Sequence, residues 1–427
     1  PGAPGCAQVR PGAPRCLSEH RSGTLGAVTR AGETADALVV GGGTIGGWCA
    51  WFLRRAGLAR VVLVERSELG RGASSRAAGM VRTQGGTPWA VKLGMWTTEF
   101  YRTQRETLGV DSGFVAQGYL MPAFTEAEVE RGRARVSMQE ALGLGVAWLD
   151  VEEADELFPA MTPRAHLGGS YASEDGYVDP PRNVTAYASA CLRDGVDVRE
   201  RDAFVSLRST PDTATVVVET ERETISAGLV VLTGGPDLAH VGRLAGTRVV
   251  AGAARHQVAV TAPHPTLAPE RIRMAFDIEE GIYWRPEDGG CLFGMSNPLE
   301  PPGAARDIDW PYLEKMRKRL AELIPATRDL GLRKAWAATI EYTPDHLPIL
   351  GAALDEEGGA IAGVTVACAA GHGMMWGPAV ARVAADLALE GRTEVLDASG
   401  LGLERFDAEG ASSLPADPIA LPFPTRA

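Results

Sequence analysis

A glycine-rich turn and the acidic residue that follows it give the first indication of chemistry. Residues 41–46 have the sequence GGGTIG, which is the pattern G-x-G-x-x-G placed between an apolar run and a helical pattern. The first glycine of this pattern makes a tight turn, the second lets the backbone approach a pyrophosphate, and the third lets helix and strand pack closely. Glu65 ends the next apolar run, where a carboxylate can accept hydrogen bonds from ribose hydroxyls. The predicted dinucleotide contacts are Gly41, Gly43, Thr44, Ile45, Gly46, Glu65 and Arg66.

Two observations narrow the choice of dinucleotide. The carboxylate of Glu65 would repel a 2′-phosphate, so the site disfavours NADP. A second glycine-rich turn, residues 369–373, precedes a predicted helix. Its unpaired N–H groups and the helix dipole suit the negative charge that reduced flavin carries near N1 and O2, which favours FAD over NAD. His372 in this turn is either close to the flavin or a structural imidazole.

Three segments together resemble a known family. They are residues 71–80 (RGASSRAAGM), residues 336–351 (WAATIEYTPDHLPILG) and residues 370–374 (AGHGM). The second is similar to W-A-G-x-x-E-x-T-P-D-x-x-P-I-x-G and the third to S-G-H-G-M, patterns of the FAD-dependent D-amino-acid oxidase superfamily. The resemblance is to its sarcosine oxidase, dimethylglycine dehydrogenase and dye-linked proline dehydrogenase branch. Residues 255–257 (RHQ) also resemble a sheet-edge segment of that family.

The resemblance implies an FAD-dependent enzyme that oxidises a C–N bond in a small amine or amino acid. A hydride would pass from the carbon that bears the amine to flavin N5, and water would hydrolyse the resulting imine. O₂ or another electron acceptor would reoxidise the flavin. The alternatives are a flavin subunit within a multi-subunit amine or proline dehydrogenase and a nicotinamide-dependent dehydrogenase. The further cofactor contacts that the resemblance implies are Ser74, Ser75, Arg76, Gly234, Gly371, His372, Gly373 and Met374.

Three positions depart from the family's patterns. Some relatives tether FAD through a Cys where this chain has Ala338, and others through a His where it has Arg76. Neither side chain can form such a bond, so we expect the FAD to be bound noncovalently. The sarcosine oxidase pattern has a Lys that helps to bind a carboxylate, and this chain has Met375 there. The third departure argues against sarcosine itself as the preferred substrate.

The substrate end of the site is expected to contain a cation and aromatic side chains. Arg82 matches a family arginine beside the flavin and could make a bidentate pair with a substrate carboxylate, or it could form a structural salt bridge. Tyr283 could form an aromatic wall with Trp284 and Trp376, or all three could be core residues. The candidates for catalytic roles are Arg82, His372 and Tyr283.

The composition describes a globular enzyme and excludes several other classes. Hydrophobic residues make up 45% of the 427 residues, and the net charge of −12 argues against a nucleic-acid partner. Six cysteines without CxxC spacing fit neither a disulfide framework nor a metal site. We expect no membrane segment, because no run approaches the roughly 20 apolar residues that a span needs. A cytoplasmic location follows as an expectation, with a homo-oligomer or a partner subunit left open.

The apolar patterns predict an α/β fold in which a Rossmann-like FAD domain is joined to an α+β substrate domain with a mixed or antiparallel sheet. The predicted strands are residues 37–40, 61–64, 114–123, 196–198, 215–219, 229–232, 256–261, 281–285, 291–295 and 364–367. The predicted helices are residues 44–56, 88–108, 125–142, 183–194, 310–324 and 378–389. The expected divisions are a flexible tail (1–35), an FAD domain (36–113, 182–247 and 335–406), a substrate domain (114–181 and 248–334) and an irregular C-terminal tail (407–427).

Overall fold

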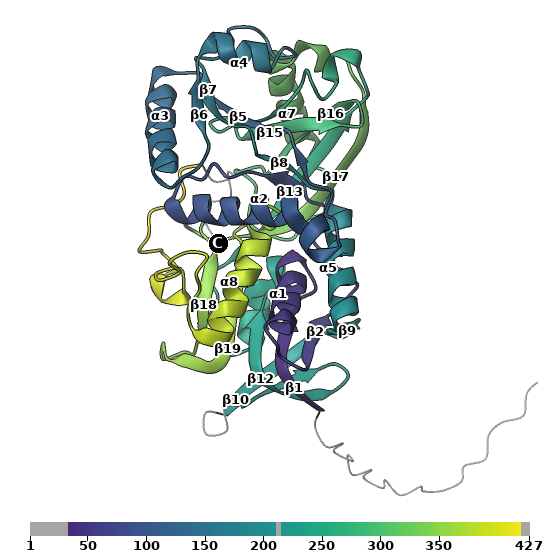
Figure 1. Ribbon diagram of the computed structural model, residues 1–427, viewed down its shortest axis with the longest axis vertical. Helices are drawn as coiled ribbons and strands as arrows, with labels where there is room; N and C mark the ends of the chain where they lie inside the picture. The colour runs from purple at the N-terminus through teal and green to yellow at the C-terminus, as the bar shows by residue number, and fades with distance from the viewer. Residues whose placement is uncertain (1–32, 211–214, 420–427) are drawn as a thin grey trace, which may run out of the picture. The chain divides into compact units, whose positions relative to one another are not determined.

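A β-α-β unit begins the part of the chain that the computed structural model describes, which is residues 33–210 and 215–419 (Figure 1). Strand β1 (Glu33–Val40) leads into the glycine turn, helix α1 (Thr44–Arg55) begins directly after it, and β2 (Val61–Glu65) pairs with β1 in parallel. Because α1 lies between the sheet and other helices, ten of its residues are buried. The predicted dinucleotide-binding unit is therefore confirmed as a structural element.

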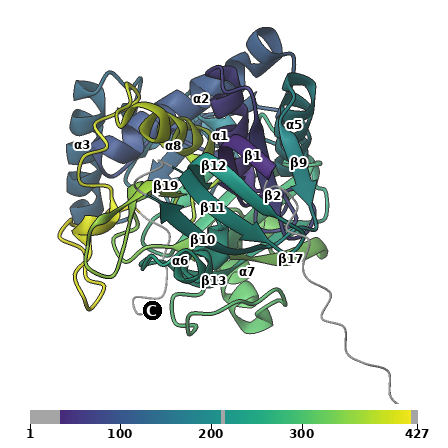
Figure 2. The same cartoon turned by 90° about the horizontal axis from the view of Figure 1, so that it is seen from below.

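The first of two eight-stranded sheets extends from this unit, with the order β10-β11-β12-β1-β2-β9 and with β19 and β18 continuing from β12 (Figure 2). The strands β9, β2, β1, β12 and β19 run parallel, whereas β10, β11 and β18 pair antiparallel with their neighbours. Parallel strands with both faces covered consist mainly of apolar residues, as β1 and β2 do. The added strands are β9 (Asp197–Glu200), β10 (Phe204–Thr210), β11 (Thr215–Thr220), β12 (Thr224–Leu232), β18 (Ile349–Leu354) and β19 (Ala360–Cys368).

Helices α1, α5 and α8 form one packed layer on the first sheet, and α2 packs against α8. Figure 1 shows α1 beside α8, and α2 crossing between this layer and the second sheet. Local sequence explains their limits: Thr87 caps α2 (Pro88–Leu108), Asp179 caps α5 (Pro180–Asp194), and each helix starts with proline and ends before a glycine with positive φ. Helix α8 (Gly377–Glu390) begins just beyond the second glycine-rich turn, so that turn lies at a helix N-terminus as predicted.

The second eight-stranded sheet has the order β17-β13-β16-β15-β14-β5-β7-β6 and is antiparallel except where β14 meets β5. Helix α7 (Trp310–Leu323) packs on it, and α3 (Glu126–Ala141) and α4 (Val151–Leu157) lie near β6 and β7. Its strands are β5 (Tyr119–Pro122), β6 (Ala147–Leu149), β7 (Gly169–Ala172), β13 (Gly252–Thr261), β14 (Met274–Asp277), β15 (Ile282–Glu287), β16 (Gly290–Met295) and β17 (Leu332–Tyr342). The predicted fold class is confirmed.

The third sheet is short and has three strands. It contains β3 (Met80–Val81), β8 (Gly176–Tyr177) and β4 (Val115–Ala116). The single strand predicted for residues 114–123 was wrong, because the chain turns at Gly118, whose φ is +72°, and so divides into β4 and β5. Helix α6 (Leu238–Leu244) follows β12 through a short 3₁₀ turn.

Three of the expected boundaries differ from the structure. Strand β1 begins at Glu33, so residues 33–35 of the expected tail are part of the sheet. Strand β17 crosses the expected limit at residue 335 and pairs along its length with β13 in the second sheet. The expected C-terminal tail has little regular structure but is packed up to Ile419, whose side chain is fully buried. The rest of the expected N-terminal tail lies outside the described residues.

Several possible features are not found in the described residues. None of their helices combines the length and apolar character that a membrane crossing requires. Their His, Cys, Asp and Glu side chains form no group of three or more that could hold a metal ion. Four cysteines fall in this part of the chain (Cys49, Cys191, Cys291 and Cys368), and all four are buried free thiols.

Candidate functional site

A cavity of about 590 Å³ opens between the glycine turn of the first sheet and strands of the second. A volume of this size is typical of small-molecule sites. The first sheet contributes both glycine-rich turns, and the second contributes side chains from β13, β15 and β17. The predicted site residues that line the cavity are Gly41, Gly43, Thr44, Ile45, Glu65, Arg66, Ser74, Arg76, Arg82, Gly234, Tyr283, Gly371, His372, Gly373 and Met374.

Gly46 and Ser75 are the two predicted cofactor contacts that do not line the cavity. Gly46 has a packing role, because a Cβ atom there would lie 1.8 Å from the carbonyl oxygen of Gly41 and 2.6 Å from Oγ1 of Thr233. This close approach lets α1 begin directly against the turn. The backbone N–H of Ser75 donates to the carbonyl of Gly70 at 3.1 Å. Ser75 therefore closes the loop that places Ser74.

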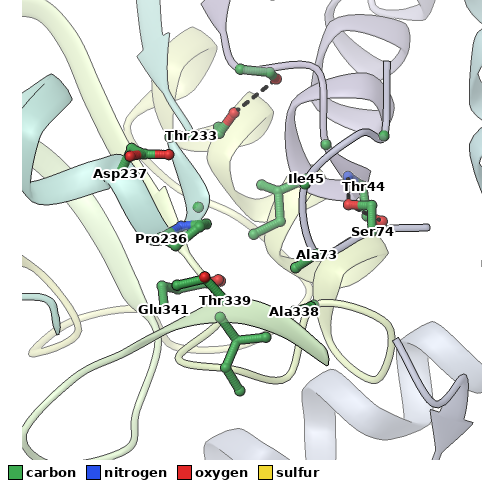
Figure 3. A pocket seen from close by; sticks show the side chains of 18 of the residues that line it. Thr44, Ile45, Ala73, Ser74, Thr233, Pro236, Asp237, Ala338, Thr339 and Glu341 are labelled. Atoms are coloured by element: carbon green, nitrogen blue, oxygen red, sulfur yellow. Dashed lines mark hydrogen bonds between the residues drawn. The ribbon is translucent and has the colours of Figure 1, made fainter. Parts of the chain in front are cut away.

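The start of α1 is open toward the cavity. Gly41 has φ +102°, and a Cβ atom on Gly43 would meet only Oγ of Ser74, at 3.1 Å. Figure 3 shows Thr44 and Ser74 side by side next to Ile45, and the N–H of Thr44 donates to Oγ of Ser74 at 2.9 Å. First-turn N–H groups have no partner inside their own helix, so they can bind a pyrophosphate here.

Glu65 is held rigidly at the end of β2. Its two carboxylate oxygens accept hydrogen bonds from the N–H of Gly42 at 2.7 Å and the N–H of Ser67 at 2.8 Å. Each oxygen keeps further lone pairs, and the side chain lines the cavity. This geometry suits an acceptor for the ribose hydroxyls.

The far wall of the nucleotide end comes from the segment after β12. Oγ1 of Thr233 donates to the carbonyl of Val40 at 2.7 Å, which joins the ends of β1 and β12 (Figure 3). Beyond Gly234, the carboxylate of Asp237 pairs with the guanidinium of Arg66 at 2.5 Å. Arg66 is thus placed at the rim of the cavity by an exposed ion pair rather than by contact with the turn.

The second glycine-rich turn leaves one nitrogen without a partner. Ala370 and Gly371 have φ values of +48° and +84°, and Nδ1 of His372 lies 2.9 Å from the carbonyl of Ala370. Because a carbonyl can only accept, Nδ1 carries the proton, and Nε2 is an acceptor in the neutral ring. Nε2 is buried without a hydrogen-bond partner among the described residues. Burial, followed by the positive charge of Arg82, lowers the pKa of His372 well below its usual value, so the ring is neutral.

The two glycine-rich turns fit a flavin dinucleotide. A Cβ atom on Gly373 would meet no described atom within 4 Å, so this side of the turn is open. The orphaned Nε2 of His372 is an acceptor at the same end of the cavity, and α8 directs its N-terminus there. Glu65 and the start of α1 suit the ribose and pyrophosphate at the other end. The residues present can therefore hold FAD along the cavity.

Arg82 is a buried cation at the flavin end. Its side chain is 3% exposed and lines the cavity. The guanidinium donates to the carbonyl of Gln84 and, at 3.2 Å, to the carbonyl of Ile419. The guanidinium carbon also lies 5.8 Å from the ring centroid of Phe276. These contacts leave some of its five N–H donors for a ligand.

The ion pairs of the described residues do not include Arg82, so the alternative that it forms a structural salt bridge is not what the structure shows. Two buried acids influence it electrostatically. Burial raises the pKa of Asp175 to about 6 and also raises that of Asp417, and the charge of Arg82 only partly opposes this. Neither acid makes a direct ion pair with Arg82, so its remaining N–H donors can still bind an anionic ligand.

A histidine that the sequence reasoning gave no role lies beside Tyr283. Nε2 of His256 is 2.6 Å from the hydroxyl of Tyr283, and Nδ1 is 2.9 Å from the hydroxyl of Ser296. His256 and Tyr283 lie on β13 and β15, with β16 between them, and both line the cavity. Gly294 of β16 permits the approach, because a Cβ atom there would lie 2.8 Å from the Tyr283 hydroxyl. The sequence signal was limited to the polar run of residues 255–257 in the middle of β13.

The aromatic wall differs from the predicted one. Trp284 follows Tyr283 on β15 and points to the opposite face, where it is buried in the core of the second sheet. Trp376 packs among the helices of the first sheet and stacks on His372, with the two ring centroids 4.0 Å apart. Tyr119 and Phe276 line the cavity with Tyr283 instead.

The two positions that carry covalent FAD in some relatives also line the cavity. Ala338 lies on β17, opposite α1 in the view of Figure 3, and Arg76 lies in the loop after Ser74. An alanine methyl group and a guanidinium offer neither a thiolate nor an imidazole to a flavin. Met375, at the position of the family's lysine, is 8% exposed and lines the same end of the cavity.

Comparisons with known proteins agree with this geometry. Residues 36–387 match the protein family described as "FAD dependent oxidoreductase" (DAO). The chain is 28% identical to glycine oxidase of Geobacillus kaustophilus (strain HTA426), over 87% of this chain and 97% of that protein. It is 26% identical to mitochondrial dimethylglycine dehydrogenase of Mus musculus over 75% of this chain, but spans only 39% of that relative.

Solved structures show the same fold. The crystal structure of glycine oxidase from Geobacillus kaustophilus superposes with a TM-score of 0.76 at 26% identity, covering 88% of this chain and all of that one. The crystal structure of L-proline dehydrogenase from P. horikoshii gives a TM-score of 0.77 at 24% identity, covering 85% of this chain and 96% of that one. At 24% identity, the likeness to L-proline dehydrogenase shows the fold alone.

Replacing Glu65 with Gln should weaken dinucleotide binding. The amide keeps one acceptor but turns an N–H₂ group toward the N–H of Gly42 or Ser67, and the charge-assisted bonds to the ribose are lost. Such bonds contribute roughly 1.5–3 kcal/mol, so the dissociation constant of FAD should rise about ten- to a hundredfold. Fluorescence titration of the apoprotein with FAD measures this. Glu68→Gln, outside the cavity, is the control; equal affinities for the two variants would contradict the assignment.

Replacing His256 with Gln should make stability less dependent on pH. Burial lowers the pKa of His256 to about 4, whereas an unfolded histidine titrates near 6.5. As the pH falls from 6.5 to 4 the unfolded state gains a proton that the folded state refuses, so stability is lost across this window by at most about 3 kcal/mol. Urea unfolding of wild type and variant at both pH values tests this, with exposed His240→Gln as control. Parallel pH dependences of wild type and His256→Gln would refute it.

Proposed function

The chain belongs to the FAD dependent oxidoreductase family, and we propose that it oxidises the C–N bond of a small amine or amino acid that carries a carboxylate. FAD is its cofactor, and the enzyme class is that of FAD-dependent oxidoreductases. The observation that supports the substrate assignment is Arg82, a buried guanidinium at the flavin end of the cavity without an ion pair among the described residues. Names of relatives, among them glycine oxidase and dimethylglycine dehydrogenase, fit the same substrate class.

FAD, when bound, would supply a two-electron acceptor for the hydride of the carbon that bears the amine. The protein's part is to bind the substrate, align its C–H bond and exclude water. Arg82 binds the carboxylate through its remaining N–H donors, and its fixed position sets the distance of the amine from that anchor. The neutral ring of His372 adds no positive charge to compete with Arg82 for the carboxylate.

Tyr283 and His256 are suited to hold the amine in its neutral form. When the Tyr283 hydroxyl donates to Nε2 of His256, its oxygen lone pairs are free to accept from an amine N–H group. Burial raises the pKa of Tyr283, so the phenol stays protonated and does not act as a base. A phenol oxygen binds the N–H group of a neutral amine without taking its proton, which keeps the nitrogen lone pair available as the hydride leaves.

Met375 and the aromatic wall favour a substrate larger than the smallest amino acids. With Met375 in place of a second cation, the carboxylate has one guanidinium to replace its hydration. Met374, Phe276 and Tyr119 offer apolar surface to the rest of the molecule. Apolar burial at roughly 25 cal/mol per Å² can compensate for the missing charge.

We expect the flavin to be released intact when the protein is denatured. Neither Ala338 nor Arg76, the two residues at the tethering positions, can bond covalently to the ring. Acid precipitation should therefore leave essentially all of the yellow colour in the supernatant, measured by absorbance near 450 nm. Flavin that stays with the protein pellet through repeated washing would show a covalent bond and refute the proposal.

Arg82→Met should selectively impair turnover of carboxylated substrates. Loss of a charged hydrogen-bond partner costs about 1.5–3 kcal/mol, so KM for a carboxylated amine should rise roughly ten- to a hundredfold. The flavin spectrum and KM for an amine without a carboxylate should change little. Steady-state kinetics with both substrates, reading H₂O₂ release and reduction of an artificial acceptor, measures the split.

The matched control is Arg285→Met. Arg285 is also buried, but it pairs with Glu287 at 2.5 Å and does not line the cavity. It should lower stability without changing the preference between the two substrates. Full activity of Arg82→Met on the carboxylated amine would overturn the proposed role of Arg82, and a wild type that prefers sarcosine would overturn the role given to Met375.

A further inference from the structure

The chain beyond the 3₁₀ turn Leu403–Arg405 returns from the first sheet to the substrate end of the cavity. We call residues 407–419 the C-terminal strap. In Figure 1 its yellow trace runs from the level of β18 towards α2 and α3. A bridge between Phe406 and Ser412 marks its beginning, and the remainder has no regular secondary structure. The strap was expected to be a tail, but both of its ends are fixed.

The beginning of the strap is held by a buried ion pair. The guanidinium of Arg405 binds the carboxylate of Asp345 at 2.7 and 3.1 Å, and both side chains are 1% exposed. The Ser412 hydroxyl donates to the same carboxylate at 2.6 Å. Asp345 belongs to the T-P-D motif that precedes β18, so this network ties the strap to the first sheet.

The end of the strap is held by the second sheet. The side chain of Ile419 is fully buried in the core formed by β5, β13, β14, β15 and β16. The carboxylate of Asp417 accepts the N–H of Ile419 at 2.9 Å, and the N–H of Asp417 donates to the carbonyl of Asp345 at 3.0 Å. A Cβ atom on Gly86 would lie 2.1 Å from the Asp417 carboxylate, which shows how closely the strap packs before α2.

This anchored end touches Arg82 directly. The carbonyl of Ile419 accepts from Nη2 of Arg82 at 3.2 Å, and the carbonyl of Gln84 accepts from Nη1. Gln84 is two residues from Arg82 and is held to the second sheet by its side-chain amide, which donates to the carbonyl of Tyr119 on β5 at 2.9 Å. Ile419 reaches the guanidinium from 337 residues away. The strap therefore adds a second hydrogen bond that ties the guanidinium to the second sheet, and this bond depends on the seating of Ile419 in the core.

We propose that the C-terminal strap is a positioning element for carboxylate recognition, in which buried Ile419 holds its own carbonyl against Arg82. This inference rests on the proposed binding of a carboxylate by Arg82. An arginine side chain has many rotamers, and a fixed acceptor removes part of that freedom before the ligand arrives. The strap acts through Arg82 and need not touch the substrate.

Shortening the anchor tests the strap without deleting it. Ile419→Ala leaves the carbonyl in the chain but removes the side chain that seats it. Ile324→Ala is the matched control, because Ile324 is also fully buried in the same core, caps the end of α7 and does not line the cavity. Ile419→Val keeps most of the buried side chain and should therefore bind acetate as the wild type does. Isothermal titration of each FAD-loaded protein with acetate measures carboxylate binding, and acetamide serves as the uncharged probe.

The dissociation constant of acetate should rise about tenfold in Ile419→Ala, as expected when an anchoring group is misplaced. It should stay within about twofold of wild type in Ile324→Ala, because Ile324 has no contact with Arg82 and distant sites act independently. It should also stay within about twofold in Ile419→Val, because valine keeps most of the buried side chain that seats the carbonyl. Acetamide binding should not distinguish the variants. In kinetics, Ile419→Ala should raise KM for a carboxylated amine more than it lowers kcat.

The outcomes separate the strap from the site it serves. If Arg82→Met abolishes acetate binding but Ile419→Ala and Ile324→Ala weaken it equally, the strap is only structural and the inference is overturned while the proposed function stands. If wild type does not bind acetate, or Arg82→Met binds it undiminished, the assignment of Arg82 fails and the inference with it. Weak binding in Ile419→Ala alone, restored in Ile419→Val, supports the inference.

Discussion

The arrangement of the substrate end depends on one guanidinium that is buried and makes no direct ion pair among the described residues. A charge in a low-dielectric interior is tolerated only if hydrogen bonds and a ligand replace its hydration. Arg82 meets this requirement through two carbonyls from distant parts of the chain and a neighbouring aromatic ring. His372 is neutral for a related reason, because burial and the charge of Arg82 both lower its pKa and so oppose a second positive charge there.

The nucleotide end could be predicted from the sequence because its determinants are local. The turn at Gly41, the contact of Gly46 with that turn and the position of Glu65 all follow within one β-α-β unit. Spacing along the chain translates directly into spacing in the structure when a strand, a turn and a helix are consecutive. For the same reason the start of α1 and the limits of α2 agree with the sequence analysis, since glycine, proline and threonine mark them.

The substrate end could not be predicted to the same depth, because its residues meet only through sheet pairing. His256 and Tyr283 come together across β16. The pairing of β15 with β16 is local, through the turn at Asp288 and Gly289, but the pairing of β13 with β16 joins segments that are far apart in the sequence. The aromatic wall illustrates the same limit: Tyr283 and its neighbour Trp284 are equally aromatic, but strand alternation sends them to opposite faces. Tyr119 lies on β5 and Phe276 on β14, and these two strands are neighbours in the sheet although they are far apart in the sequence.

The C-terminal strap shows how a segment of weak local pattern can still be strongly determined. Residues 407–419 contain proline and small residues, which predict neither helix nor strand, and their conformation follows from the partners at the two ends. One end is fixed by the buried pair of Asp345 and Arg405 on the first sheet, the other by Ile419 in the core of the second. The strap therefore joins both sheets to Arg82. Any shift of one sheet relative to the other would move the carbonyl of Ile419 relative to Arg82. The geometry of carboxylate binding therefore depends on how the two sheets are held together.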